Sequence, residues 1–183
     1  YASKELKNNE DIVKIAVKQD GWALQFSSER LQDNEEIVKE AVKQNGYNLK
    51  FASNELKDNE EIVKEAVKQN GEALEYVSKR LRDDEEIVKI AVNQKGLALK
   101  FASNFQDNEE IVKEAVQQKG DALQYALNFQ DNEEMVKLAV QQDGKALRYA
   151  SKRLKDNENI VKEAVKQNGR ALQFASNFQD NEE

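Results

Sequence analysis

Residues 33–57 read DNEEIVKEAVKQNGYNLKFASNELK, and seven versions of this string follow one another along the 183-residue chain. The glycines mark the repeat, because successive glycines are 24 or 25 residues apart and every one stands at the same place in the string. They are Gly21, Gly46, Gly71, Gly96, Gly120, Gly144 and Gly169. Self-similarity at so short and regular a period is typical of repeat proteins, in which each unit packs on its neighbours.

The glycine positions set the boundaries of the units. We predict one repeat array over residues 1–183, with complete units at 8–32, 33–57, 58–82, 83–106, 107–130, 131–155 and 156–179, here numbered first to seventh. Residues 1–7 and 180–183 are partial units. Neither partial unit has the polar outer face of a capping repeat. We therefore expect the chain to be a slice of a longer array, or alternatively to stack head-to-tail with other copies.

The first half of each unit reads as an amphipathic helix. Asp33 is the predicted N-cap, with Glu36 at the capping-box spacing, as at Asp58 and Asp131. In every unit an acid precedes a lysine by four residues, the favourable order for a helical ion pair, as in Glu35 and Lys39. The apolar residues fall on one helical face: Ile37, Val38, Ala41 and Val42.

A turn and a second helix complete the unit. Gly46 is predicted to end the first helix as a left-handed C′ residue. The second helix then presents Leu49, Phe51, Ala52 and Leu56. In the three shorter units a phenylalanine stands one position before the missing leucine, and we expect it to fill that place through a tighter turn: Phe105, Phe129 and Phe178.

These short helices predict the fold class. Helices this short are unstable alone in water, so each must bury its apolar stripe against the next unit. We predict an all-α protein, an α-solenoid of tandem 24–25-residue helix-turn-helix repeats. The pattern carries no information on the hand of the superhelix.

Composition excludes several kinds of function. The chain has no cysteine and no histidine, so it lacks thiol nucleophiles, the usual zinc ligands and the usual base near neutral pH. We predict no enzyme activity, no cofactor and no metal site. The net charge of −7 argues against nucleic-acid binding, and no targeting or membrane-spanning segment is seen, so we expect a soluble protein that does not bind membranes.

The string VKQNGxALxFAS followed by LKDNEEIV, as at residues 43–63 with small departures, resembles a known family. It is the family of short tandem helical repeats called domain of unknown function 4116. The resemblance covers essentially the whole chain and implies a repeat architecture without an assigned activity. The departures are Asn48 and Val77, which replace alanine, and Leu127, which replaces serine.

Two residue types recur at fixed places. A glutamine stands two residues before every glycine, and we expect its amide to bond groups at the turn or in the stacked neighbour. The alternative is an amide ladder that binds an extended peptide. Six units keep a serine in the second helix, as at Ser53, Ser78 and Ser151, where we favour close packing over catalysis. The run Asp-Asn-Glu-Glu is interpreted as helix capping and not as a calcium site.

The residue after each glycine varies most, and these seven positions are the candidate partner-binding residues: Trp22, Tyr47, Glu72, Leu97, Asp121, Lys145 and Arg170. A fixed scaffold that displays one changeable residue per unit is one interpretation, and simple exposure is the other. Trp22 and Tyr47 favour a contact site, because aromatic side chains often anchor interfaces. The sixth unit carries a charge of +2 and could bind an acidic partner.

The leading functional hypothesis is a non-enzymatic helical-repeat scaffold for protein–protein interaction, with an unidentified protein partner. The first alternative is a structural spacer or filament component without a specific ligand. The second is a modular reader of peptide or nucleic acid that uses one residue per repeat.

Overall fold

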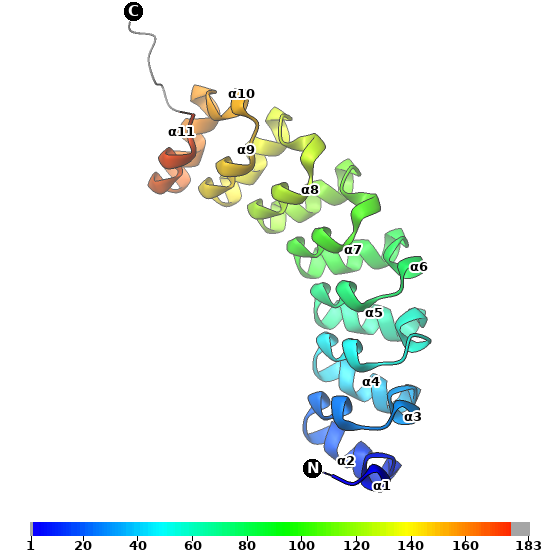
Figure 1. Ribbon diagram of the computed structural model, residues 1–183. Helices are drawn as coiled ribbons and strands as arrows, with labels where there is room; N and C mark the ends of the chain where they lie inside the picture. The colour runs from blue at the N-terminus through cyan, green and yellow to red at the C-terminus, as the bar shows by residue number, and fades with distance from the viewer. Residues whose placement is uncertain (1, 177–183) are drawn as a thin grey trace, which may run out of the picture. The chain divides into compact units, whose positions relative to one another are not determined.

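The computed structural model describes residues 2–176 and divides the chain into two compact units, 1–94 and 95–183, which are treated separately below (Figure 1). Every regular element among the described residues is a helix, which confirms the all-α repeat prediction. None of these helices is both long and apolar enough to cross a membrane. A single superhelix that runs through both units stays a prediction.

Each repeat contains a ten-residue α-helix, a six-residue 3₁₀ helix and a third short helical segment. In unit 1 the long helices are α2 (Glu10–Gln19), α4 (Glu35–Gln44), α5 (Glu60–Gln69) and α7 (Glu85–Gln94). The 3₁₀ helices are η1 (Gly21–Phe26), η2 (Gly46–Phe51) and η4 (Gly71–Tyr76), and the short segments are α1 (Lys4–Lys7), α3 (Glu29–Gln32), η3 (Leu56–Asp58) and α6 (Lys79–Arg82).

Unit 2 has the same elements in the same order. Its long helices are α8 (Glu109–Gln118), α9 (Glu133–Gln142) and α11 (Glu158–Gln167). Its 3₁₀ helices are η5 (Gly96–Phe101), η7 (Gly120–Tyr125), η9 (Gly144–Tyr149) and η10 (Gly169–Phe174). The short segments are η6 (Ser103–Phe105), η8 (Leu127–Phe129) and α10 (Lys152–Lys155).

The prediction of two helices per repeat was wrong, because the second helix is two separate segments. The buried positions Gly46, Leu49 and Ala52 are three residues apart, which is the period of a 3₁₀ helix, whose side chains at i and i+3 align. At Ala52 the backbone turns extended (φ −69°, ψ 159°), so η2 ends there. Leu56 lies beyond this break, in η3, and is buried from a different segment.

The predicted N-cap is displaced by one residue. The side chain of Asn34, not that of Asp33, accepts a hydrogen bond from the backbone N–H of Ile37 (3.1 Å). Asn59 and Asn132 have the same role before α5 and α9. Asp33 is instead the C-cap of α3. The acidic residues that follow the asparagine lie in the first turn, where the helix dipole favours negative charge.

The predicted left-handed role of glycine was also wrong. The long helix α4 ends at Gln44, the cap residue Asn45 is extended (φ −157°), and Gly46 is the first residue of η2. Glycine is needed for close approach, since a Cβ on Gly46 would lie 2.0 Å from the carbonyl oxygen of Ala66 in the next repeat. Five other glycines face the next repeat in the same way, while a Cβ on Gly169 would meet nothing within 4 Å.

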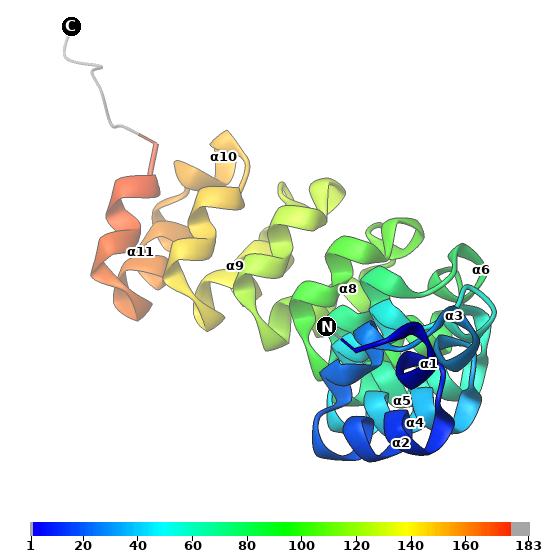
Figure 2. The ribbon, with the colours of Figure 1, turned by 60° about the horizontal axis from the view of Figure 1, so that its bottom comes forward.

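Within each unit, successive repeats pack long helix on long helix and 3₁₀ helix on 3₁₀ helix (Figures 1 and 2). The predicted apolar stripe forms this core, and Ile37, Val38, Ala41 and Val42 are all 0–1 % exposed. Burial of each such side chain stabilises the fold by about 1.5–3 kcal/mol for the larger residues. The stack is therefore held mainly by contacts between adjacent repeats.

The conserved glutamines form polar contacts between repeats, as expected from the structural interpretation. Gln44 Oε1 accepts a hydrogen bond from the N–H of Gly21 (2.8 Å), and its Nε2 donates to the carbonyl of Val17 (2.6 Å). Gln94, Gln118 and Gln167 accept in the same way from the glycine of the preceding repeat. Each amide thereby satisfies a donor at the start of a 3₁₀ helix, where the backbone has no partner of its own.

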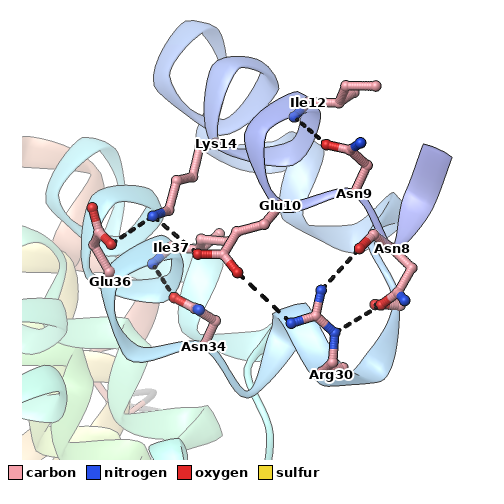
Figure 3. Close-up of polar contacts among 10 residues, drawn as sticks. Asn8, Asn9, Glu10, Ile12, Lys14, Arg30, Asn34, Glu36 and Ile37 are labelled. Carbon is pink, nitrogen blue, oxygen red and sulfur yellow. Dashed lines mark hydrogen bonds and ion pairs between the residues drawn. The ribbon is translucent and has the colours of Figure 1, made fainter. Parts of the chain in front are cut away.

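Lysines on the long helices join two carboxylates each. Lys14 lies 3.1 Å from Glu10 in its own helix and 2.7 Å from Glu36 in the next repeat (Figure 3). The same arrangement recurs at Lys39 and at Lys64. The i,i+4 pair was predicted, whereas the second carboxylate depends on stacking. Both partners raise the pKa of these lysines, because they stabilise the charged ammonium.

The shorter repeats do make a tighter third segment. Phe105 and Phe129 lie in three-residue 3₁₀ turns, η6 and η8. Both rings are only half-buried, whereas Leu31 and Leu154 in longer repeats are fully buried, so the phenylalanines fill the leucine site in part. Phe178 lies outside the described residues.

We predict that Gly46→Ala destabilises the protein, because the added Cβ must displace the Ala66 carbonyl. Such overpacking typically costs about 1–3 kcal/mol. Gly169→Ala is the matched control, since its Cβ has open space. Chemical denaturation followed by circular dichroism measures both variants. Equal unfolding midpoints for the two would contradict the role of close approach.

Candidate functional site

The seven variable residues occupy one structural position, the second residue of each 3₁₀ helix. The residue before the glycine often fixes the backbone there, as when Asn45 accepts from the N–H of Tyr47 (3.0 Å). Because adjacent 3₁₀ helices pack on each other within a unit, the variable residues form one row in each unit. In unit 1 the row contains Trp22, Tyr47 and Glu72; in unit 2 it contains Leu97, Asp121, Lys145 and Arg170.

Trp22 is the centre of a small aromatic cluster in unit 1. Its ring meets that of Phe51 in the next repeat edge-to-face, with centroids 5.0 Å apart. The ammonium of Lys50 lies 3.8 Å from the Trp22 centroid and 4.6 Å from that of Phe51, which is cation–π geometry. Trp22 is still 42 % exposed. We call Trp22, Lys50 and Phe51 the Trp22 cluster.

Tyr47 makes the equivalent contact one repeat later, but it is more enclosed. Its hydroxyl donates to Glu72 Oε2 (3.2 Å), and its ring packs edge-on against Tyr76 at 5.7 Å. Burial raises the pKa of Tyr47 to about 12, helped by the negative charge of Glu72, because both disfavour the phenolate. Tyr47 and Glu72 thus connect the second and third repeats, and each is half-buried.

In unit 2 the row is held by an ion pair. Arg148 lies 3.1 Å from Asp121 of the preceding repeat, and its guanidinium stacks over Tyr149 at 4.5 Å. Arg153, another cation of the positively charged sixth repeat, pairs with Asp131 at 3.1 Å. Part of the predicted basic surface is therefore neutralised within the unit. Of the variable residues, Trp22 and Arg170 are classed as exposed, and the other five are half-buried.

Sequence reasoning missed a second set of aromatic residues in the row. The last residue of the 3₁₀ helix, five positions after the glycine, is aromatic in all seven repeats: Phe26, Phe51, Tyr76, Phe101, Tyr125, Tyr149 and Phe174. The invariant spacing from glycine was the available signal. These rings supply the surface against which the preceding repeat's variable side chain packs, as the contacts of Trp22 and Tyr47 illustrate.

The repeated serine has a polar role, and the prediction that it packs between helices was wrong. The hydroxyl of Ser78 donates to Asp58, and its oxygen caps α6 by accepting from the N–H of Leu81 (3.3 Å). Arg80 joins the group through Nε to the Asp58 carboxylate (3.1 Å) and Nη2 to its backbone carbonyl (2.9 Å). In the first repeat Asn8 replaces the aspartate and receives the same bonds from Ser28 and Arg30 (Figure 3).

The serine hydrogen bond and then Arg80 lower the pKa of Asp58, since both stabilise its carboxylate. This arrangement binds the short segments of adjacent repeats together. It gives the serine no activating base, because the only titratable partner is an ionised carboxylate already occupied by arginine. Within residues 2–176 no three acidic side chains are grouped so as to hold a metal ion.

Tyr47 gives a prediction at high pH. Its folded-state pKa of about 12 is raised above the ordinary value of 10.0, so the stability linked to its neutral form is present below pH 10 and lost as pH rises through 12. Glu72→Gln should lower the pKa of Tyr47 without restoring the ordinary value, because burial remains. Ultraviolet titration of tyrosinate, with Tyr47→Phe to assign the signal and Glu36→Gln as control, measures this. An unchanged titration in Glu72→Gln would refute the assignment.

Asp58 gives a prediction at low pH. Its pKa is depressed below 3.8, so the stability from its carboxylate is present above the unfolded-state value and lost as pH falls through the folded-state pKa. Asp58→Asn copies the arrangement of Asn8 and removes the titration. We expect the melting temperature of the parent chain to fall more steeply below pH 4 than that of Asp58→Asn. Parallel curves for the two proteins would count against this coupling.

Comparison with known families places this repeat geometry. A family model described as "Domain of unknown function (DUF4116)" matches residues 1–32, 34–82, 84–129 and 132–179. Each of the last three matched segments spans two of the repeats defined above. Searches of curated proteins and of solved structures found no match.

Proposed function

The chain belongs to the DUF4116 family of domains of unknown function, and because that membership carries no activity, we propose from its own geometry that it is a non-enzymatic scaffold that binds another protein. The observation that carries the proposal is the Trp22 cluster. It combines a half-exposed indole with a cation held over it, on a backbone fixed by stacking. Tryptophan is among the residues most enriched at the energetic centres of protein interfaces.

The geometry of the cluster favours a protein partner over other ligands. Trp22 and Phe51 offer an apolar surface, and Lys50 offers one positive charge at its edge. A partner segment with an apolar side chain beside a carboxylate would satisfy both. The charge of the whole chain, −7, opposes nucleic acid, whose affinity depends on neutralised phosphates. The absence of histidine and cysteine supports a role without catalysis.

A spacer without a specific ligand is the second candidate, and one observation favours it. Tyr47, Glu72 and Asp121 hold neighbouring repeats together, so much of the variable row is occupied by internal contacts. The same contacts weigh against a modular reader, which needs every variable residue available to the ligand. The two remaining candidates differ in whether exposure of Trp22 matters to any association.

The test compares Trp22→Ala with the parent chain as immobilised bait, and quantitative mass spectrometry measures each captured protein. We expect at least one protein to be retained by the parent chain and reduced about 30-fold or more by Trp22→Ala, the loss typical of a hot-spot residue. Val17→Ala is the matched control, since it removes buried methyl groups in the same repeat and leaves the surface unchanged. A capture profile that Trp22→Ala leaves unaltered would favour the spacer.

A retention assay on immobilised heparin at physiological salt tests the reader of nucleic acid directly. We expect the chain to pass through unretained because of its net charge. Retention that high salt abolishes would replace the proposed protein partner with a polyanion.

A further inference from the structure

The two ends of the described stack expose different apolar faces. In the seventh repeat Val161 and Val165 are half-buried and Leu172 is 62 % exposed. Their equivalents in the sixth repeat, Val136, Val140 and Leu147, are fully buried. Val161, Val165 and Leu172 therefore form what we call the V face, which inside a unit is covered by the following repeat. The V face lines a hollow of about 370 Å³ that also includes Lys162.

The first repeat exposes the opposite set. Ile12 is 44 % exposed, and Ala16 and Ala23 are half-buried. The equivalent positions in the third repeat are fully buried: Ile62, Ala66 and Ala73. Ile12, Ala16 and Ala23 form what we call the I face, which inside a unit is covered by the preceding repeat. It lines a hollow of about 230 Å³ together with Leu6 and Phe26.

Inside each unit these two kinds of face pack against each other. The pairing is seen where Gly46, at the V-type side of the second repeat, lies against the carbonyl of Ala66, at the I-type side of the third. Gly71 meets Ala91 and Gly144 meets Ala164 in the same way. The V face and the I face are thus the two halves of one interface that the structure repeats along both units.

The polar contacts of this interface are also available at the ends. Internally a glutamine of the following repeat bonds the glycine N–H, and a lysine reaches an acid of the following repeat, as in Lys39 to Glu61 (2.9 Å). The V-face end supplies Gly169 and Lys162, and a Cβ on Gly169 would meet nothing within 4 Å. The I-face end supplies Gln19 and Asp11 at the matching positions.

We infer that a second copy of this chain docks head-to-tail, its I face covering the V face of the first. In the docked pair Gly169 lies against the carbonyl of Ala16, Gln19 bonds the N–H of Gly169, and Lys162 joins Asp11. The interface is heterologous, so each added copy leaves one face of each kind open and growth continues beyond the dimer. This association is independent of the Trp22 cluster.

The register of docking limits its strength. Residues 174–183 and 1–10 are equivalent in sequence, so both would serve the same junction of the docked pair. The association is therefore weaker than the contacts within a unit, and it increases with chain concentration.

Sedimentation velocity over a concentration series tests the assembly, with expected species larger than the dimer at the highest concentrations. Gly169→Leu should abolish them and leave the helical circular dichroism and melting temperature unchanged, because its side chain enters open space in the monomer. Ile15→Ser is the matched control: it removes an apolar side chain that is 65 % exposed and belongs to neither face. Only monomer up to about 1 mM would overturn the inference, as would dissociation by Ile15→Ser and not by Gly169→Leu.

A mixing experiment tests the polarity of the contact. Gly169→Leu retains an intact I face, and Ile12→Arg, altered at a position exposed in the monomer, retains an intact V face. Each variant alone should be monomeric, and an equal mixture should form a dimer that grows no further. A parent chain that stops at the dimer, or variants that fail to combine when mixed, would contradict head-to-tail docking.

Discussion

Close approach between the backbones of adjacent repeats governs this protein. Each glycine of the internal interfaces comes so near to an alanine carbonyl of the next long helix that a single Cβ would collide, at 2.0–2.9 Å from the oxygen. At this spacing the apolar stripe can be buried by residues as small as alanine and valine. The same spacing brings the next repeat's glutamine within hydrogen-bonding distance of the glycine N–H. Packing and polar satisfaction thus depend on one residue without a side chain.

Three sets of polar contacts accompany this core, each on a different edge of the repeat. Glutamine bonds the start of the 3₁₀ helix, lysine joins acids on successive long helices, and serine with arginine holds the aspartate at the short segment. The lysine and arginine pairs are largely exposed, so each adds little to stability. Their geometric effect is larger, because every pair joins a residue to one in an adjacent repeat. They favour the native register over a stack displaced along the helices.

The variable row shows how a repeat surface divides between structure and recognition. Where the residue after glycine can bond or pack on the next repeat, as at Tyr47 and Asp121, it becomes part of the stack. Trp22 is too large to be covered by Phe51 and Lys50 alone, so part of the indole remains in solvent. Exposure in this row therefore follows from the size of a side chain relative to its neighbours. That property belongs to pairs of repeats, and it distinguishes Trp22 from residues at the same sequence position.

Periodicity alone predicted the all-α repeat, the buried stripe at Ile37, Val38, Ala41 and Val42, and the i,i+4 pairs, because these depend on residues close in sequence. It also located the seven variable positions, and the spacing of aromatic residues from glycine would have located the other side of their row. The role of glycine, the shift of the N-cap from Asp33 to Asn34, the polar role of serine and the break at Ala52 required the tertiary structure. Each of these depends on a group about 20 residues away, which a pattern within one repeat does not contain. Neighbouring repeats decide them, since a backbone collision or a hydrogen bond across the interface exists only after stacking.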